Sequence, residues 1–113
     1  MAFAGIGMEH LKFAFAGKHA PQKFEAILVG VVGSGNLEVL MEPGQDPAHC
    51  TISITTSARG FGPIWEAVAQ NFQAQHQLAG VAISINDMGA TPAVVSLRLD
   101  QAAASLPAPK AST

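Results

Sequence analysis

The sequence is poor in several residue types, and each shortage excludes a class of protein. Cys50 is the single cysteine among 113 residues, so one chain cannot form a disulfide framework, which fits a reducing compartment. Charged residues make up only 12%, and Lys and Arg are scattered singly, so no patch for nucleic acid or an anionic membrane is present. No apolar run approaches the ~20 residues of a membrane helix, and the N-terminus lacks a basic leader. We expect a soluble cytoplasmic protein without a signal peptide.

The apolar content, 49% of the chain, is sufficient for one modest core, and the length fits a single small domain. We expect an N-terminal extension over residues 1–7, one domain over residues 8–105, and a flexible tail rich in Pro, Ala and Ser over residues 106–113. No internal repeat and no second domain are visible.

Several segments have the patterns of β-strands. Apolar and polar residues alternate as in half-buried strands over 10–15, 37–42, 50–56 and 81–86. Residues 25–32 are almost continuously apolar and rich in β-branched side chains, which predicts a strand covered on both faces.

The break Gly33-Ser34-Gly35-Asn36 separates the strands over 25–32 and 37–42, and it predicts a β-hairpin in which Gly33 or Gly35 supplies a positive φ. The strand over 50–56 is expected to follow the strand over 37–42 as its partner in a further hairpin.

Proline marks the start of two predicted helices, because it suits the first helical turn. One helix is expected from Pro63 to about His76 or Gln77, with an inner stripe of Ile64, Trp65, Val68, Ala69 and Phe72. Thr91 can cap the second helix, and its inner stripe contains Val94, Val95 and Leu99, to which Ala102 can be added.

The resulting order is β-β-β-β-α-β-α. It predicts an α+β fold, a small mostly antiparallel sheet with both helices packed on one face. The order of the strands within the sheet is not readable from the sequence.

Most catalytic patterns are absent. His10, His19, His49 and His76 share no ligand spacing, so no metal site is expected. His49 and Cys50 are neighbours on a strand and point to opposite faces, so Cys50 is expected to be a buried small hydrophobe.

Ser34 is also unsuited to the common roles of a serine or glycine loop. A hydrolase elbow, a dinucleotide loop and a P-loop all require a helix after the loop, whereas a strand follows Ser34. We therefore predict no catalytic residue. Two interpretations remain for Ser34: an ordinary turn residue, which the spacing alone favours, or an exposed hydroxyl for covalent attachment, flanked by Gly33 and Gly35.

Two motifs resemble one known family. VGVVGSGNLEVL at 29–40 and INDMGATPAVVSLRL at 85–99 are similar to the acyl carrier, or delta, subunit of malonate decarboxylase. The family pattern also fits from Met8 in MEHLKFAF and at Thr55-Thr56-Ser57 before a Trp-containing helix, so the resemblance covers about residues 8–103.

The resemblance implies a specific role for Ser34. In the family, the serine of the VGSG motif carries 2'-(5''-phosphoribosyl)-3'-dephospho-CoA through a phosphodiester, and that residue here is Ser34. The implied partners are a loading transferase, a malonyl-transfer enzyme and the decarboxylase subunits. The malonyl-transfer enzyme exchanges acetyl for malonyl on the arm, and the decarboxylase subunits then release carbon dioxide. The carrier itself is implied to be non-catalytic, with the chemistry supplied by the arm and its partners.

The sequence departs from the family pattern at one position. The family usually has Asp after VGSG, and this chain has Asn36, which keeps the shape and turn preference but lacks the charge. Two other hypotheses stay open: a small α+β binding or regulatory module without a prosthetic group, and a free-standing hydrolase using Ser34, for which no motif places a base.

Overall fold

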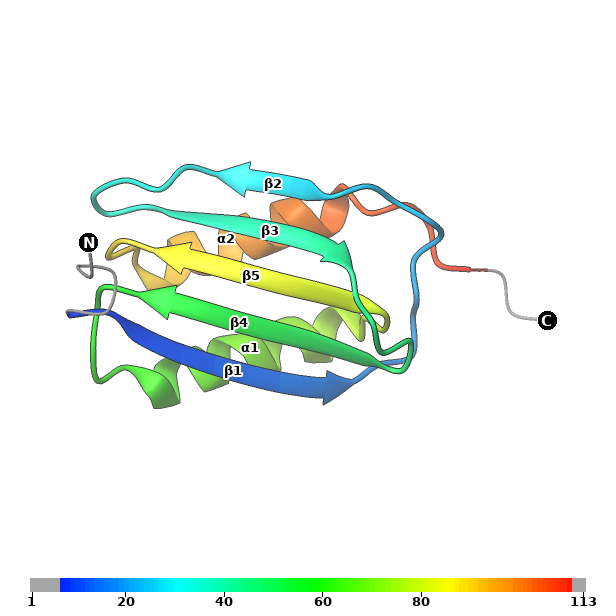
Figure 1. The fold of residues 1–113 in the computed structure, drawn as a ribbon, viewed down its shortest axis with the longest axis horizontal. Helices are drawn as coiled ribbons and strands as arrows, with labels where there is room; N and C mark the ends of the chain where they lie inside the picture. The colour runs from blue at the N-terminus through cyan, green and yellow to red at the C-terminus, as the bar shows by residue number, and fades with distance from the viewer. Residues whose placement is uncertain (1–6, 111–113) are drawn as a thin grey trace.

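The strands and helices follow the chain order that the sequence predicts, and the α+β fold class is confirmed. The computed structural model describes residues 7–110, so the predicted N-terminal extension lies, apart from Gly7, outside the described residues. The elements are β1 (Glu9–Ala16), β2 (Ile27–Gly30), β3 (Leu37–Pro43), β4 (His49–Thr56), α1 (Gly62–His76), β5 (Val81–Asp87) and α2 (Pro92–Ala104) (Figure 1). Neither of these two helices is long and apolar enough to cross a membrane.

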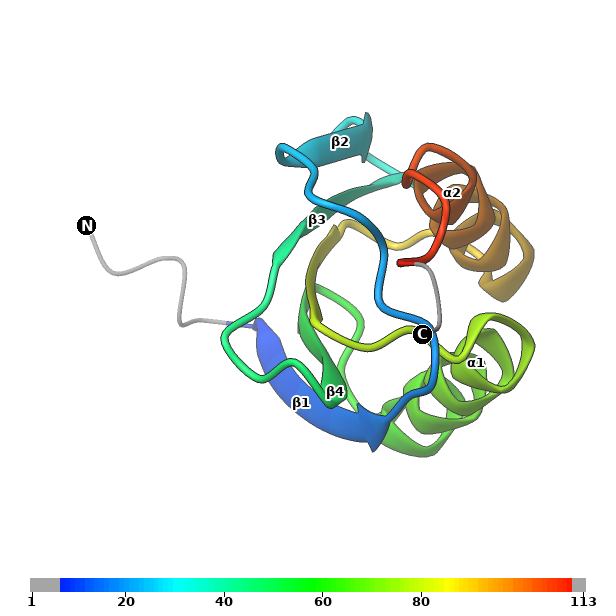
Figure 2. The ribbon, with the colours of Figure 1, turned by 90° about the vertical axis from the view of Figure 1, so that its right-hand side faces the viewer.

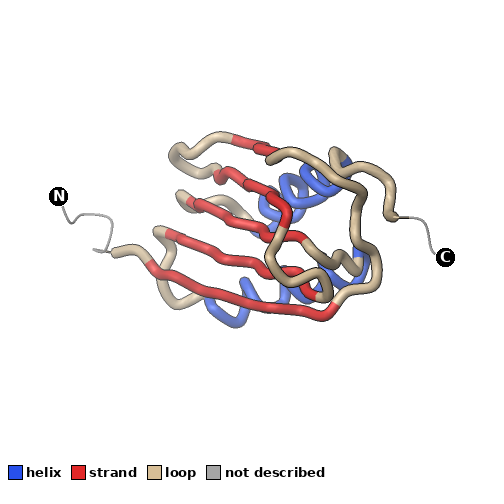
Figure 3. Tube along the Cα trace, turned by 45° about the vertical axis from the view of Figure 1, so that its right-hand side comes forward, coloured by secondary structure: helices blue, strands red, loops and turns tan. Residues whose placement is uncertain are grey.

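The five strands form one sheet in the order β1-β4-β5-β3-β2. The pairs β1–β4, β3–β5 and β2–β3 are antiparallel, and β4–β5 is parallel. α1 forms the crossover between the two parallel strands, and α2 follows β5. Both helices lie on the same face of the sheet, as the end-on view and the tube show (Figures 2 and 3).

The predicted hairpin between residues 37–42 and 50–56 is wrong. β4 pairs with β1, where Phe13 lies opposite Ile52, and with β5, where Ile52 lies opposite Ile83. β5 occupies the place beside β3 that the hairpin would require. The alternating pattern predicts which face of a strand is buried, but it does not indicate which other strand pairs with it.

The prediction that the 25–32 strand is covered on both faces is also wrong. β2 is a four-residue edge strand, and Ile27 and Val29 pack against the core while Leu28 is 60% exposed. Val31 and Val32 belong to the loop after it and are more than half exposed. The helices cover one face of the sheet only, so this apolar run is half-buried at most.

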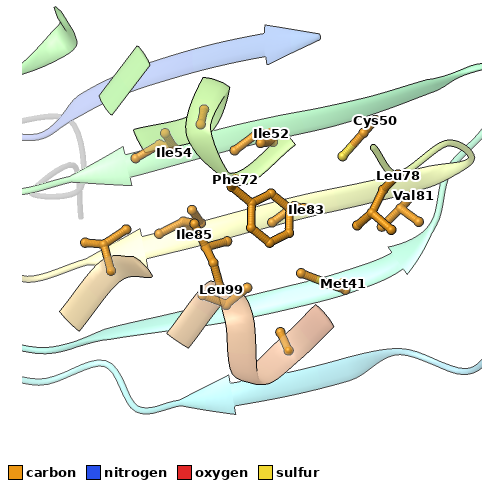
Figure 4. Packing of buried hydrophobic residues seen from close by; sticks show 14 of the residues in the cluster. Met41, Cys50, Ile52, Ile54, Phe72, Leu78, Val81, Ile83, Ile85 and Leu99 are labelled. Carbon is orange, nitrogen blue, oxygen red and sulfur yellow. The ribbon is translucent and has the colours of Figure 1, made fainter. Parts of the chain in front are cut away.

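The core fills the space between the sheet and the two helices (Figure 4). The three inner strands contribute alternate residues that are almost fully buried: Leu37, Val39, Met41, Cys50, Ile52, Ile54, Val81, Ile83 and Ile85. The helices contribute Trp65, Ala69, Phe72, Val95, Leu99 and Ala102. The predicted inner stripes are correct except at Ile64, which is 45% exposed, and at Val68 and Val94, which are only partly buried.

The C-terminal segment lies against the domain as far as Lys110. Leu106 packs on the core, the Lys110 N–H donates to the Ala20 carbonyl at 2.8 Å, and the Gln22 N–H donates to the Ala108 carbonyl at 3.0 Å. The first five residues of the predicted flexible tail are therefore held by backbone hydrogen bonds, and residues 111–113 lie outside the described part.

Gln73 is a buried polar residue that the helical stripe does not predict. Its side-chain amide donates to the carbonyls of Ala16 at 3.1 Å and Leu78 at 2.8 Å, and its Oε1 accepts the Leu78 N–H at 3.1 Å. These bonds connect the end of β1, α1 and the chain leading into β5.

We expect Gln73→Leu to lower the free energy of unfolding by about 2 kcal/mol or more, because buried backbone groups lose their partners. The measurement is urea unfolding followed by circular dichroism. Gln75→Leu, on the exposed side of the same helix, is the matched control and should leave the midpoint nearly unchanged. Equal effects of the two changes would contradict the role given to Gln73.

Candidate functional site

Ser34 lies at the tip of a four-residue β-turn between β2 and β3. The Asn36 N–H donates to the Gly33 carbonyl at 2.9 Å, and Gly35 has φ +72°, which places Ser34 second in a turn of type II character. Of the two glycines predicted to supply a positive φ, Gly35 does so. Gly33 does not appear among the residues with positive φ.

The Ser34 side chain is exposed and its surroundings are open. A Cβ added at Gly33 or Gly35 would meet no atom within 4 Å. Within residues 7–110 the Ser34 hydroxyl makes no hydrogen bond to another protein group. The hydroxyl is therefore accessible to a second protein from several directions.

The backbone that follows Ser34 is fixed more firmly than its exposure suggests. The Gly35 N–H donates to the Met88 carbonyl at 2.8 Å, and the Met88 N–H donates to the Asn36 carbonyl at 2.9 Å. This pair of bonds continues the β3–β5 ladder beyond the ends of both strands. The turn thus presents Ser34 at a defined place beside the β5–α2 connection (Figure 1).

The β5–α2 connection is held by the buried carboxylate of Asp87, which is 1% exposed. Its oxygens accept the Thr56 hydroxyl at 2.8 Å, the Gly89 N–H at 3.2 Å and the Ala90 N–H at 2.9 Å. Asp87 therefore links the end of β4 to the loop that holds the Ser34 turn. We did not identify Asp87 from the sequence, although an Asp followed by Met-Gly-Ala is a signal for such an Asx-turn.

An apolar cleft of about 350 Å³ lies between the N-terminal ends of α1 and α2, next to the same loop. Its walls include Phe61, Ile64, Trp65 and Val68 on the α1 side and Pro92 and Val95 on the α2 side. Phe61 and Ile64 are nearly half exposed there. The sequence pattern did not reveal this cleft because it assigned Ile64 to the core.

The other sequence candidates do not assemble into a site. In the part of the chain that the structure describes, no three His, Cys, Asp or Glu side chains lie close enough to hold a metal ion. His10 contacts Thr55, and His76 contacts Asp100 at 3.2 Å. Cys50 is fully buried on the helix side of β4, as predicted, and burial raises the pKa of its thiol to about 12.

A family model described as the malonate decarboxylase delta subunit matches residues 25–106. The chain belongs to the malonate decarboxylase delta subunit, or acyl carrier, family. A relative described as malonate decarboxylase acyl carrier protein from Burkholderia cepacia is 62% identical over 100 residues, covering 88% of this chain and 92% of the relative. One with the same description from Stenotrophomonas maltophilia is 54% identical, covering 88% of this chain and 94% of the relative.

A solved structure agrees with this family membership. The structure is a crystal structure of a Pseudomonas malonate decarboxylase hetero-tetramer in complex with malonate. One of its chains matches with a TM-score of 0.77 and 41% sequence identity, covering 85% of this chain and 96% of that one. The resemblance of the two motifs to the acyl carrier family is therefore confirmed.

In this acyl carrier family member, Asn36 occupies the position at which the family usually has Asp, and its side chain takes part in the turn. Asn36 Oδ1 accepts the Leu37 N–H at 2.8 Å, and a carboxylate oxygen can accept the same bond. The turn that presents Ser34 therefore does not depend on a negative charge at position 36.

The hairpin tip depends on Gly30 more than on Gly33. Gly30 has φ +89°, and an added Cβ would lie 2.3 Å from the Leu37 carbonyl oxygen and 3.4 Å from Arg98 Cδ. Gly33 has no neighbour within 4 Å and no positive φ.

We expect Gly30→Ala to lower the free energy of unfolding by about 1–3 kcal/mol, because both steric overlap and φ strain oppose it. Gly33→Ala is the matched control and should cost much less. Thermal unfolding of the two variants decides the point, and a larger loss for Gly33→Ala would contradict the turn geometry described above.

The Cys50 thiol should be inert in the folded chain. Since its pKa is raised, the thiol stays protonated at pH 8, and burial also blocks access to a reagent. An aromatic disulfide reagent such as DTNB should find no reactive thiol in the folded bare protein at pH 8 and one per chain after unfolding in guanidinium. Rapid reaction of the folded bare chain would show that Cys50 is exposed by local opening.

Proposed function

We propose that this chain is the non-catalytic acyl carrier subunit of a malonate decarboxylase that converts malonate to acetate and carbon dioxide. We further propose that the Ser34 Oγ bears 2'-(5''-phosphoribosyl)-3'-dephospho-CoA through a phosphodiester. The observation that carries the proposal is the exposed Ser34 hydroxyl on a turn that is anchored to Met88. The chemistry of the group is what the resemblance to the acyl carrier family implies, and the family match over residues 25–106 supports that resemblance.

The residues around Ser34 fit a large covalent adduct. A phosphodiester needs space on every side of the Oγ atom, and the open volume at Gly33 and Gly35 provides it. A loading transferase must also grasp the turn, and the exposed Val31 and Val32 beside it offer an apolar surface for that contact.

Attachment requires little chemistry from this chain. The Ser34 hydroxyl loses its proton to the loading transferase, its oxygen bonds to an activated phosphate of the incoming donor, and the donor's leaving group departs. When bound, the group supplies a terminal thiol that carries acyl groups as thioesters, which stabilise the carbanion formed on loss of carbon dioxide. Ser34 then fixes the root of the arm, so each transfer occurs at high effective concentration.

The proposed partners follow from the same role. The chain must meet a loading transferase once, and a malonyl-transfer enzyme and the decarboxylase subunits in every cycle. The related Pseudomonas chain lies in a hetero-tetramer crystallised with malonate, which supports assembly with other subunits. Cys50 is not the acyl-bearing thiol, because it is buried and its pKa is raised.

The test is the intact mass of the chain after co-expression with the loading enzymes. We expect one coenzyme-A-sized adduct on the wild type, located on Ser34 by peptide mapping, and no adduct on Ser34→Ala. Ser57→Ala, which changes an exposed loop serine elsewhere, is the matched control and should be loaded normally. An unmodified wild type would favour the binding or regulatory module, and an adduct on Ser34→Ala would place the attachment at another residue.

A further inference from the structure

Residues 87–89 connect the cleft between the two helices to the turn that bears Ser34. Gly35, next to Ser34, is hydrogen-bonded to Met88, and the neighbours of Met88 in the chain, Asp87 and Gly89, line the cleft. Figure 1 shows the β2–β3 turn, the β5–α2 connection and the start of α1 at the same end of the molecule. The proposed root of the arm and the cleft therefore share one rigid support.

The lining of the cleft selects the chemistry of its occupant. Its walls are apolar, and the volume of about 350 Å³ lies in the range of small-molecule sites. Asp87 is the one ionisable residue among the lining residues, and its carboxylate oxygens are already hydrogen-bonded to Thr56, Gly89 and Ala90. The cleft is thus built for an uncharged, slender and mainly apolar group.

The first turn of α1, which contributes Ile64 and Trp65 to the cleft lining, has backbone donors without a partner in the helix. Phe61 precedes the helix and provides no side-chain cap, so the N–H groups of Gly62 and Ile64 have no acceptor within the helix. A pantetheine chain combines a thiol and methylene groups, which suit the walls, with amide carbonyls, which need such donors.

We propose that this cleft is the resting site of the thiol-bearing end of the arm on Ser34. The inference rests on the proposed function, since it takes the arm as the occupant. Because the arm is tethered next to the cleft, its effective concentration is in the millimolar range, so even a millimolar affinity keeps it docked about half of the time. Docking shelters the thiol and its acyl group from water until a partner subunit draws the arm out.

The experiment measures the reactivity of the arm thiol in the loaded chain. Cys50 is buried, so the arm provides the reactive thiol for DTNB at pH 8, and free coenzyme A gives the reference rate. We expect the loaded wild type to react at least about twofold more slowly than free coenzyme A, since only the undocked fraction, about half at millimolar affinity, reacts.

Two variants test whether the cleft is the place at which the arm thiol is protected. Ile64→Glu places a charge at the exposed mouth of the cleft and should restore a rate close to that of free coenzyme A. Leu97→Glu, which replaces an exposed leucine of α2 outside the cleft, is the matched control and should react like the wild type. Circular dichroism checks that both variants are folded.

Trp65, the single tryptophan, lines the cleft and gives a second readout that needs no variant. We expect its fluorescence and its indole N–H resonance to change between the bare and the loaded chain. A loaded chain whose thiol reacts at the free rate, with Trp65 unchanged, would overturn this inference and leave the proposed function intact.

Two further outcomes also count against the inference. Absence of any adduct on Ser34 by mass would overturn both it and the proposed function. A thiol protected equally in the wild type and Ile64→Glu would place the arm elsewhere, with the cleft left for a side chain of a partner subunit.

Discussion

The buried carboxylate of Asp87 organises the end of the molecule at which Ser34 is presented. A charged group in an apolar interior is costly unless its oxygens are hydrogen-bonded. Thr56, Gly89 and Ala90 supply the donors, and this fixes the end of β4 and the loop that leads into α2. Met88, held between these residues, then offers its backbone to Gly35 and Asn36. The position of the exposed Ser34 hydroxyl therefore depends on a buried carboxyl group that is distant in the sequence and connected to the turn through Met88.

Local features of the chain could be predicted from the sequence because their causes are local. Pro63 and Pro92 lie in the first turns of the two helices, and Thr91 caps α2 by accepting the Val94 N–H at 3.3 Å. Alternation identified the buried face of each inner strand. The β2–β3 hairpin was predicted correctly because its turn signal is local. The neighbours of β4 were not, since β4 lies beside β1 and β5 and not beside β3, and a period of two residues does not specify a neighbour.

The features of the candidate site were likewise predictable only where their causes are local in the sequence. The exposure of Ser34 could be predicted from the Gly33-Ser34-Gly35 break alone, whereas the proposal that it is an attachment point came from the resemblance of two motifs. The cleft could not be predicted, because it depends on how the first turns of α1 and α2 are placed across the sheet. Ile64 shares a helical stripe with Trp65, yet it lies at the mouth of an open space.

The pairing of residues 108–110 with residues 20–22 places the C-terminal segment at the far end of the sheet from the β2–β3 turn (Figure 1). The molecule thereby has two distinct ends: one bears the exposed Ser34 hydroxyl, and the other takes no part in presenting it. A fluorophore coupled near Lys110 and a second one on the proposed arm would measure the distance between the two ends of the molecule. That distance would report whether the proposed arm is folded back or extended when a partner subunit binds.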